Sequence, residues 1–209
     1  VKISDIVSKN YANVDADFLA SALPDTNKVD INGGLFAIGK NSITGEGSTI
    51  NVNLTRSDSA INGALYQDEL GKINLSLANE AKFILKQSTG YYAGNSYKSN
   101  DTINNLRMDS FATFDMSKDG VYSTLKIGNL TGNDGVFLLK TDLQSEKADY
   151  VIVDAADGEQ THSVGIIDKN GMVANNGSYV KISETPNNVS LKEFVLPVDT
   201  GVYQYKPLI

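Results

Sequence analysis

The sequence lacks cysteine and tryptophan entirely, and it contains a single histidine, His162. Without cysteine there can be no disulfide and no thiolate ligand, which excludes a disulfide scaffold and a cysteine-rich zinc site. Asn, Ser, Thr and Gly are abundant instead. We interpret this profile as that of an exported bacterial surface protein, which has to stay unfolded during its passage across a membrane.

Positive charge is also scarce, with 18 Lys and Arg against 25 Asp and Glu, and a net charge of −7. Nucleic acids and anionic lipid surfaces both need clustered basic residues, so the charge balance argues against either partner. No apolar run approaches the roughly 20 residues of a membrane-spanning helix. The first residue is Val1 and no signal peptide precedes it, so we expect the chain to be a piece of a longer protein.

The chain does contain many short stretches in which apolar and polar residues alternate. Such stretches are residues 49–54, 72–77, 81–85, 125–127, 150–153 and 163–166. A period of two residues predicts β-strands with one buried face. Clusters rich in Gly and Asn separate these stretches, as at 131–135, and they supply the positive φ angles that tight corners need.

Two of these stretches repeat with the same internal spacing. The runs from Leu75 to Leu85 and from Leu106 to Met116 are both apolar at their first, third, seventh, ninth and eleventh positions. A looser copy follows at Leu125-x-Ile127 and Phe137-x-Leu139. Each copy is two short strands joined by a polar corner, which can bury its apolar face only by stacking on a neighbour. The spacing favours a solenoid, and a β-sandwich is the alternative.

Two segments depart from this pattern. Residues 15–23 place Phe18, Leu19, Ala22 and Leu23 on one helical face, which favours a short helix or a loop excursion from the repeat. Residues 91–102 are polar and unpatterned, so we expect a loop that projects between repeats. Three tyrosines that could contact a partner cluster around that loop: Tyr91, Tyr92 and Tyr97.

No group of residues indicates catalysis or metal binding. His162 begins an apolar stretch and no Ser-His-Asp pattern accompanies it, so we expect it to be structural. Acidic pairs such as Asp154 and Asp157 are not concentrated as a glycosidase site requires. The segment 131–137 resembles one calcium-binding β-roll repeat, but such sites need several tandem copies, so we expect a plain turn. We therefore expect no enzyme activity and no catalytic, cofactor-binding or metal residue.

From about Phe111 to Ile209 the chain resembles the end of a pertactin-like autotransporter passenger. Residues 125–142 resemble the family's L-x-V-x-x-L-x-G-x-G-x-F repeat. Residues 147–164 resemble its x-D-x-L-x-V-x-x-x-A-x-G-x-H-x-L-x-V signature, and residues 199–205 resemble its closing G-x-Y-x-Y-x-L. The departures are Asp134 within the first glycine turn and residues 206–208 after the last tyrosine.

The resemblance implies that different parts of the whole protein have different roles in export and folding. Passengers of this family cross the outer membrane through a C-terminal β-barrel, and their last coils, called the autochaperone region, fold first and template the rest. A solenoid grows by adding one coil to an existing edge, so its first coil has to be stable alone. We expect these residues to form that nucleus by packing: Phe114, Phe137, Tyr150, Ile152, Val164, Phe194, Tyr203 and Tyr205.

The sequence therefore predicts an all-β, right-handed parallel β-helix, with coils over residues 1–111 and an autochaperone-like cap over 112–209. The function that the resemblance implies is the stem and folding nucleus of a secreted or surface-displayed Gram-negative passenger, an adhesin or related virulence factor. The alternative is the stem of a passenger whose N-terminal part is an enzyme or toxin. The expected partners are the chain's own translocator β-barrel, upstream coils and a host receptor or glycan, with no cofactor.

Overall fold

The computed structural model describes residues 2–3, 5–9, 12–18, 29–39, 44–87, 89–92, 95–168 and 180–194, and all regular elements in these residues are β-strands. Their burial follows the alternation in the sequence. In β6 (Thr49–Leu54), for example, Ile50, Val52 and Leu54 are buried and the residues between them are half-buried. Apolar and polar residues alternate here because successive side chains of a strand point to opposite faces.

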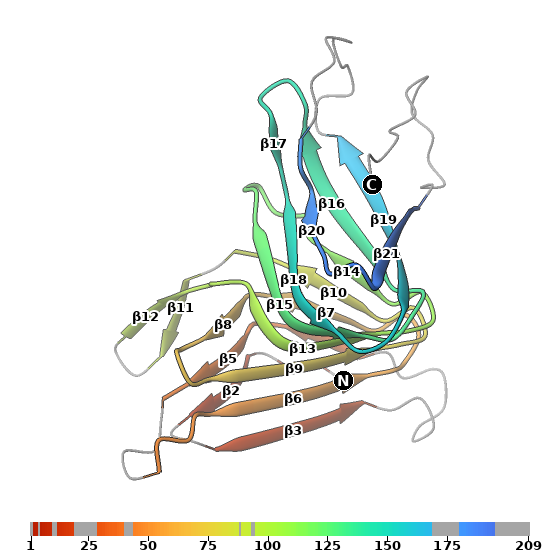
Figure 1. The fold of residues 1–209 in the computed structure, drawn as a ribbon. Helices are drawn as coiled ribbons and strands as arrows, with labels where there is room; N and C mark the ends of the chain where they lie inside the picture. Colours follow the sequence, from red (N-terminus) through yellow and green to blue (C-terminus); the bar gives the residue numbers. More distant parts are fainter. Residues whose placement is uncertain are drawn as a thin grey trace.

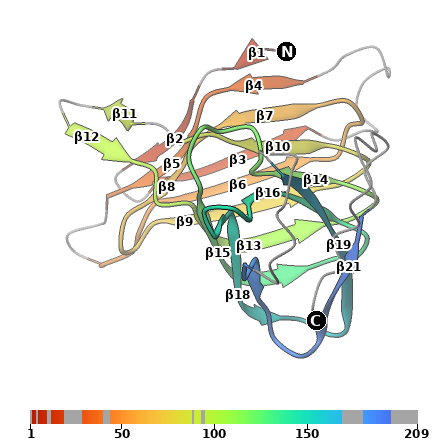
Figure 2. The ribbon, with the colours of Figure 1, turned by 90° about the horizontal axis from the view of Figure 1, so that it is seen from above.

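Three parallel sheets wrap around one core (Figures 1 and 2). The first sheet contains β1 (Lys2–Ile3), β4 (Asp30–Asn32), β7 (Ala60–Gly63), β10 (Lys82–Leu85), β14 (Thr113–Asp115), β16 (Val136–Asp142), β19 (Gln160–Asp168) and β21 (Val189–Glu193), with β17 (Lys147–Ala148) antiparallel to β16. The second contains β3 (Asn13–Phe18), β6, β9 (Lys72–Leu77), β13 (Thr102–Met108), β15 (Thr124–Thr131), β18 (Tyr150–Ala156) and β20 (Ser183–Glu184). The short third sheet contains β2 (Ile6–Lys9), β5 (Leu35–Ile38) and β8 (Leu65–Gln67).

The chain visits these sheets in a fixed order. In each of the first three coils it runs through the first sheet, the third and then the second before it returns to the first. Successive strands within a sheet pair in parallel one coil apart, as β3 does with β6 and β6 with β9. This stacking of coils in parallel sheets is a parallel β-helix, as the sequence predicted.

The sequence repeat that favoured a solenoid corresponds to the pairing of strands in successive coils. Leu75 pairs with Leu106, and Phe83 pairs with Phe114, one coil apart. The looser copy is only half in register, since Phe137 pairs with Phe114 but Ile127 pairs with Ile103 rather than with Met108. The match at Leu125-x-Ile127 was therefore wrong by several residues, because β13 and β15 are longer than the pattern that defined the copy.

The corners between the second and first sheets use left-handed backbone. Positive φ occurs at Asn79 and Glu80 in one coil, at Ser110 and Phe111 in the next, and at Gly132 and Asp134 in the third. The amide of Phe111 donates to the carbonyl of Asp134 at 3.0 Å, so successive corners are also stacked. A side chain at Gly132 would approach the Met108 carbonyl oxygen to 2.4 Å, which explains why the predicted turn at 131–135 needs glycine there.

The helix favoured near 15–23 was wrong for the part that the structure describes. Residues 15–18 belong to β3, where Val14, Ala16 and Phe18 pack against the core and the alternate residues point outward. Pairing along β6 satisfies one edge of the backbone of β3 and outweighs a weak helical pattern of only a few apolar residues. Residues 19–23 lie outside the described residues.

The segment at 91–102 is more regular than the loop that we expected. It holds most of an antiparallel hairpin, β11 (Thr89–Tyr92) with β12 (Asn95–Lys98), and Thr102 already begins β13. The hairpin stands away from the stacked sheets (Figures 1 and 2). It follows β10 at the stage of the coil where β2, β5 and β8 formed the third sheet in the preceding coils.

Candidate functional site

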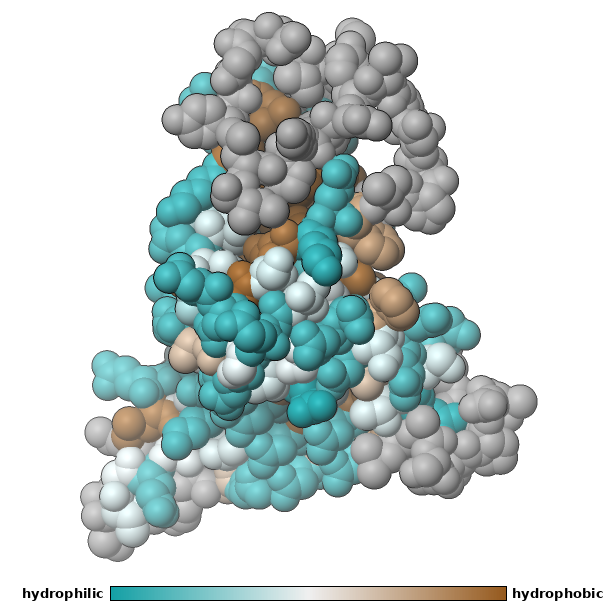
Figure 3. Space-filling view, turned by 45° about the vertical axis from the view of Figure 1, so that its right-hand side comes forward, coloured by the Kyte–Doolittle hydropathy of each residue, from teal (hydrophilic) through white to brown (hydrophobic). Residues whose placement is uncertain are grey.

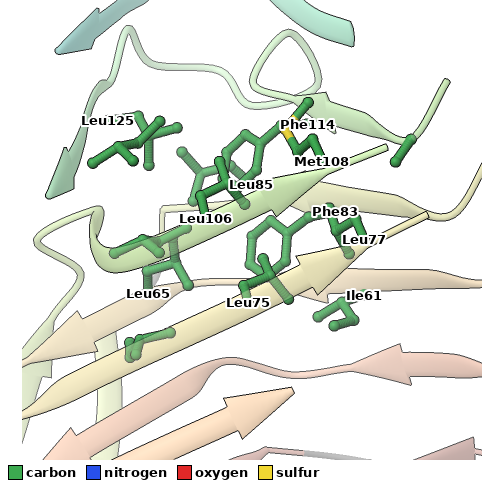
Figure 4. Close-up of a cluster of buried hydrophobic side chains, with 14 of the residues drawn as sticks. Ile61, Leu65, Leu75, Leu77, Phe83, Leu85, Leu106, Met108, Phe114 and Leu125 are labelled. Atoms are coloured by element: carbon green, nitrogen blue, oxygen red, sulfur yellow. The ribbon is translucent and has the colours of Figure 1, made fainter. Parts of the chain in front are cut away.

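A row of rings runs through the core along the first sheet. The ring centroids of Phe83 and Phe114 are 5.0 Å apart with the planes nearly parallel, and those of Phe114 and Phe137 are 6.4 Å apart. Leu75, Leu77, Leu106 and Met108 of the second sheet surround this row (Figure 4). Stacked rings gain about 0.5–1.5 kcal/mol beyond the burial of their area, so the row ties β10, β14 and β16 together.

His162 continues this row at its C-terminal end. Its ring meets Phe137 edge-on at a centroid distance of 6.2 Å and is fully buried. Nδ1 accepts the Gly135 amide at 3.2 Å, and Nε2 lies 3.3 Å from Oε1 of Gln160. Burial lowers the pKa of His162, while Asp109 and Asp134 raise it in part, so the neutral ring with its proton on Nε2 fits these partners. The geometry is that of a packed core histidine.

The predicted packing residues fall into four groups. Phe114, Phe137 and Val164 are buried in the main hydrophobic cluster, as we expected. Phe194 is half-buried, one residue beyond β21, and its amide donates to the Val164 carbonyl at 2.8 Å. Tyr203 and Tyr205 lie outside the described residues.

Tyr150 and Ile152 are on the other side of β18 from the core. They are half-buried, and the core positions of this strand are Val151 and Val153. The Tyr150 hydroxyl instead donates to Glu184 at 2.7 Å, and Lys181 lies 5.8 Å from its ring centroid. All four residues of the run 150–153 are apolar or aromatic, so the pattern alone could not show which pair faces inward.

The expected partner-contact tyrosines belong to the projecting hairpin. Backbone pairing sets Tyr91 opposite Ser96, Tyr92 opposite Asn95 and Tyr97 opposite Gly90. The structure describes the backbone of these residues and not their side chains, so a contact role for them stays a prediction.

An ion pair buried beside the core was missed in the sequence. Nζ of Lys140 lies 3.3 Å from Oδ1 of Asp149, and both side chains are fully buried. The ammonium also donates to the carbonyls of Asp119 at 3.2 Å and Val121 at 2.6 Å, and the ring of Tyr122 lies 4.9 Å away. A lysine within the apolar strand Val136–Asp142 was the available signal, because a strand interior accepts a charge only when it is paired.

Outward-facing asparagines form a ladder across the second sheet. The amide of Asn105 donates to Asn74 at 2.6 Å, that of Asn74 to Asn51 at 2.7 Å, and that of Asn51 to Asp15 at 2.7 Å. The parallel register of β6, β9 and β13 aligns these asparagines, since Asn51 pairs with Asn74 and Asn74 with Asn105. Because the bonds run along the stacking direction, the ladder holds successive coils in register.

The buried groups described above pack together and form hydrogen bonds between coils. Within the described part of the chain, no cluster of three or more His, Asp or Glu residues could hold a metal ion. The apolar crevice between the last coils is lined by residues such as Leu130, Val151 and Leu191, without an acid or a base. The described residues also include no helix long and apolar enough to span a membrane.

Comparison with known proteins agrees with this picture. The family model named Pertactin matches residues 103–208, which is just over half of the 209 residues and includes the strands from β13 to β21. The search of curated proteins finds no match. The matched region contains Phe114, Phe137, His162 and the pair Lys140 and Asp149, and these residues hold its coils together. The chain therefore belongs to the pertactin family, and its residues 103–208 are a pertactin-like autotransporter passenger region.

Proposed function

We propose that this chain is the β-helical stem and folding nucleus of an autotransporter passenger that is displayed on a Gram-negative surface or secreted, and that serves as an adhesin or related virulence factor. The observation that carries the proposal is the row of buried rings from Phe83 to His162, which passes into the family-matched region. The row brings tightly packed rings into the C-terminal coils, and a nucleus for outward growth requires such stable packing.

The open N-terminal end of the solenoid supports upstream coils as a partner. The inward residues of β3 are half-buried, whereas those of β6 and β9 are buried. A further coil stacked on β1, β2 and β3 would cover these residues and pair their free edges. We also propose the chain's own translocator β-barrel as a partner, and a host receptor or glycan for the hairpin of Tyr91, Tyr92 and Tyr97.

We propose that the chain has no enzyme activity of its own. The buried His162 and Lys140 are held in packing and hydrogen-bond networks, and the apolar crevice of the described part lacks ionisable groups. The second candidate is a stem whose passenger carries an enzyme or toxin in an N-terminal part. The stem's role is the same in both cases, so the sequence of the full passenger distinguishes them.

Proteolysis of the whole chain at intermediate urea concentrations tests the folding nucleus. We expect a resistant fragment that begins near residue 112 and retains the C-terminal coils, because these coils have to persist when the others open. Mass spectrometry of the fragment gives its ends. Loss of the whole chain in a single transition, with no resistant fragment, contradicts the proposal.

A further inference from the structure

A group of polar side chains closes the β-helix where the third sheet ends, and we call it the polar plug. The plug comprises Gln87, Ser99, Asp101, Asp119, Ser123, Lys140 and Asp149. It begins directly beyond β8, since the Asn100 amide donates to the Leu65 carbonyl at 3.0 Å. In the first three coils this side is a ladder of backbone hydrogen bonds, and side chains replace that ladder here.

The plug is one connected network. The Gln87 side-chain amide donates to Asp101 and, at 3.0 Å, to Ser123, and the Gln87 backbone amide donates to Asp119. Ser99 donates to Oε1 of Gln87 at 2.7 Å. The Ser123 amide donates to Asp149 at 3.0 Å, and Asp149 in turn pairs with Lys140. The plug thus joins three successive coils.

Charge within the plug does not balance. It holds three carboxyl groups, Asp101, Asp119 and Asp149, and a single ammonium, that of Lys140. With all carboxyl groups ionised, two negative charges lie at the edge of the core without a matching cation in the plug. Burying an unbalanced charge is costly, so the group with the poorest hydrogen bonding is the one that should accept a proton.

The number of donors identifies that group. Asp149 accepts two backbone amides, from Ser123 and Lys140, as well as the Lys140 ammonium. Asp119 accepts the backbone amides of Gln87 and Gly120. Asp101 is only 4% exposed, and its Oδ1 is buried with no hydrogen-bond partner among the described residues. Gln87 supplies the hydrogen bond to its Oδ2.

We propose that Asp101 is a proton-operated latch, which takes up a proton under mildly acidic conditions and thereby strengthens the polar plug that joins the hairpin-bearing coil to the two coils after it. The protonated carboxyl can donate to Oε1 of Gln87 once that amide turns by half a rotation, and Ser99 and Ser123 can reverse their roles to match. This latch goes beyond the stem function and does not depend on it.

The titration expected for Asp101 fits this geometry. The pKa of Asp101 is raised to about 6, chiefly by burial and also by the charges of Asp119 and Asp149, while the Gln87 hydrogen bond lowers it in part. Burial also raises the pKa of Asp149, but its two amide donors and Lys140 lower it. Because the folded-state pKa of Asp101 lies above its unfolded value, the folded state is penalised at neutral pH, and the penalty is relieved as pH falls through about 6.

Replacement by asparagine tests the latch, since Asp101→Asn is neutral at every pH and asparagine tolerates the positive φ of this position. We expect the variant to be more stable than the parent chain at pH 8. The ratio of the two folding equilibrium constants should fall about tenfold between pH 8 and pH 5, as the parent gains its proton. Urea unfolding at both pH values measures this ratio. Both proteins keep His162, so its own titration cancels.

Asp58→Asn is the matched control, because Asp58 also has a positive φ but is exposed. The ratio of its folding equilibrium constant to that of the parent chain should not change with pH. The carboxyl carbon shift of Asp101 in the parent chain gives a second readout that needs no variant, with an expected midpoint near pH 6. A midpoint near the ordinary value of about 4, or a pH-independent ratio for Asp101→Asn, overturns the proposal.

Discussion

Phe114 is fully buried between two other rings, and this position determines how much stability its replacement removes. Replacing it with alanine leaves a cavity that the parallel strands on either side cannot close, so we expect Phe114→Ala to lower the free energy of unfolding by about 3–5 kcal/mol. Urea unfolding checks this value. Phe111→Ala is the control, because Phe111 is 62% exposed only three residues away and should change stability by about 0.5 kcal/mol or less.

At the residue scale, the buried His162 also makes the free energy of unfolding depend on pH. Burial lowers its folded-state pKa, so below its unfolded value the unfolded chain binds a proton that the folded chain does not. The contribution of His162 to the free energy of unfolding is therefore complete above about pH 6.5 and decreases below it, by at most about 1.4 kcal/mol for each pH unit. His162→Asn keeps an acceptor for the Gly135 amide and should lose less stability between pH 7.5 and pH 5 than the parent chain. An equal loss in both proteins would show that His162 is not the group responsible.

At the scale of the element, the pair of Lys140 and Asp149 attaches β16 to the start of β18. Lys140→Met removes the only charge partner of a buried carboxylate within the polar plug, so we expect a loss of about 3–5 kcal/mol. The double variant Lys140→Met with Asp149→Asn should recover part of that loss, because the unpaired charge is gone. Lys126→Met is the control, since Lys126 is exposed on β15. Equal stability of the single and double variants would count against a charge effect.

At the scale of the whole molecule, each coil is supported by its neighbours. The inward residues of β9 and β13 are buried under coils on both sides, whereas those of β3 are half-buried and β3 pairs with β6 alone among the described strands. We expect native-state hydrogen exchange to be fastest at β3 and slowest at β9 and β13, because protection follows support from both sides. Uniform exchange rates along the second sheet would contradict this view of the solenoid.

The sequence by itself determined the β class, the stacking and the family. Alternation indicated strands, and the repeat of Leu75 to Leu85 at Leu106 to Met116 favoured stacking over a sandwich, because a period of two and a fixed coil spacing survive in any parallel stack. The ordered motifs at 125–142, 147–164 and 199–205 indicated the family. Phe114, Phe137 and Val164 were expected to pack because the resemblance places them in the autochaperone-like region, and the structure buries all three. The assignment of residues 112–209 as a separate nucleus stays a prediction, since one hydrophobic cluster runs from Ile6 to Val189 across that boundary.

Only the tertiary structure decided the rest. Which residues of 150–153 face inward depended on pairing with β15, because every residue of that run is compatible with burial. Residues 15–18 became a strand because β6 offered an edge. The polar plug joins residues far apart in the chain, so no local pattern could indicate that Asp101, Lys140 and Asp149 share one buried network. Its balance of charge and hydrogen bonds exists only once the coils are stacked.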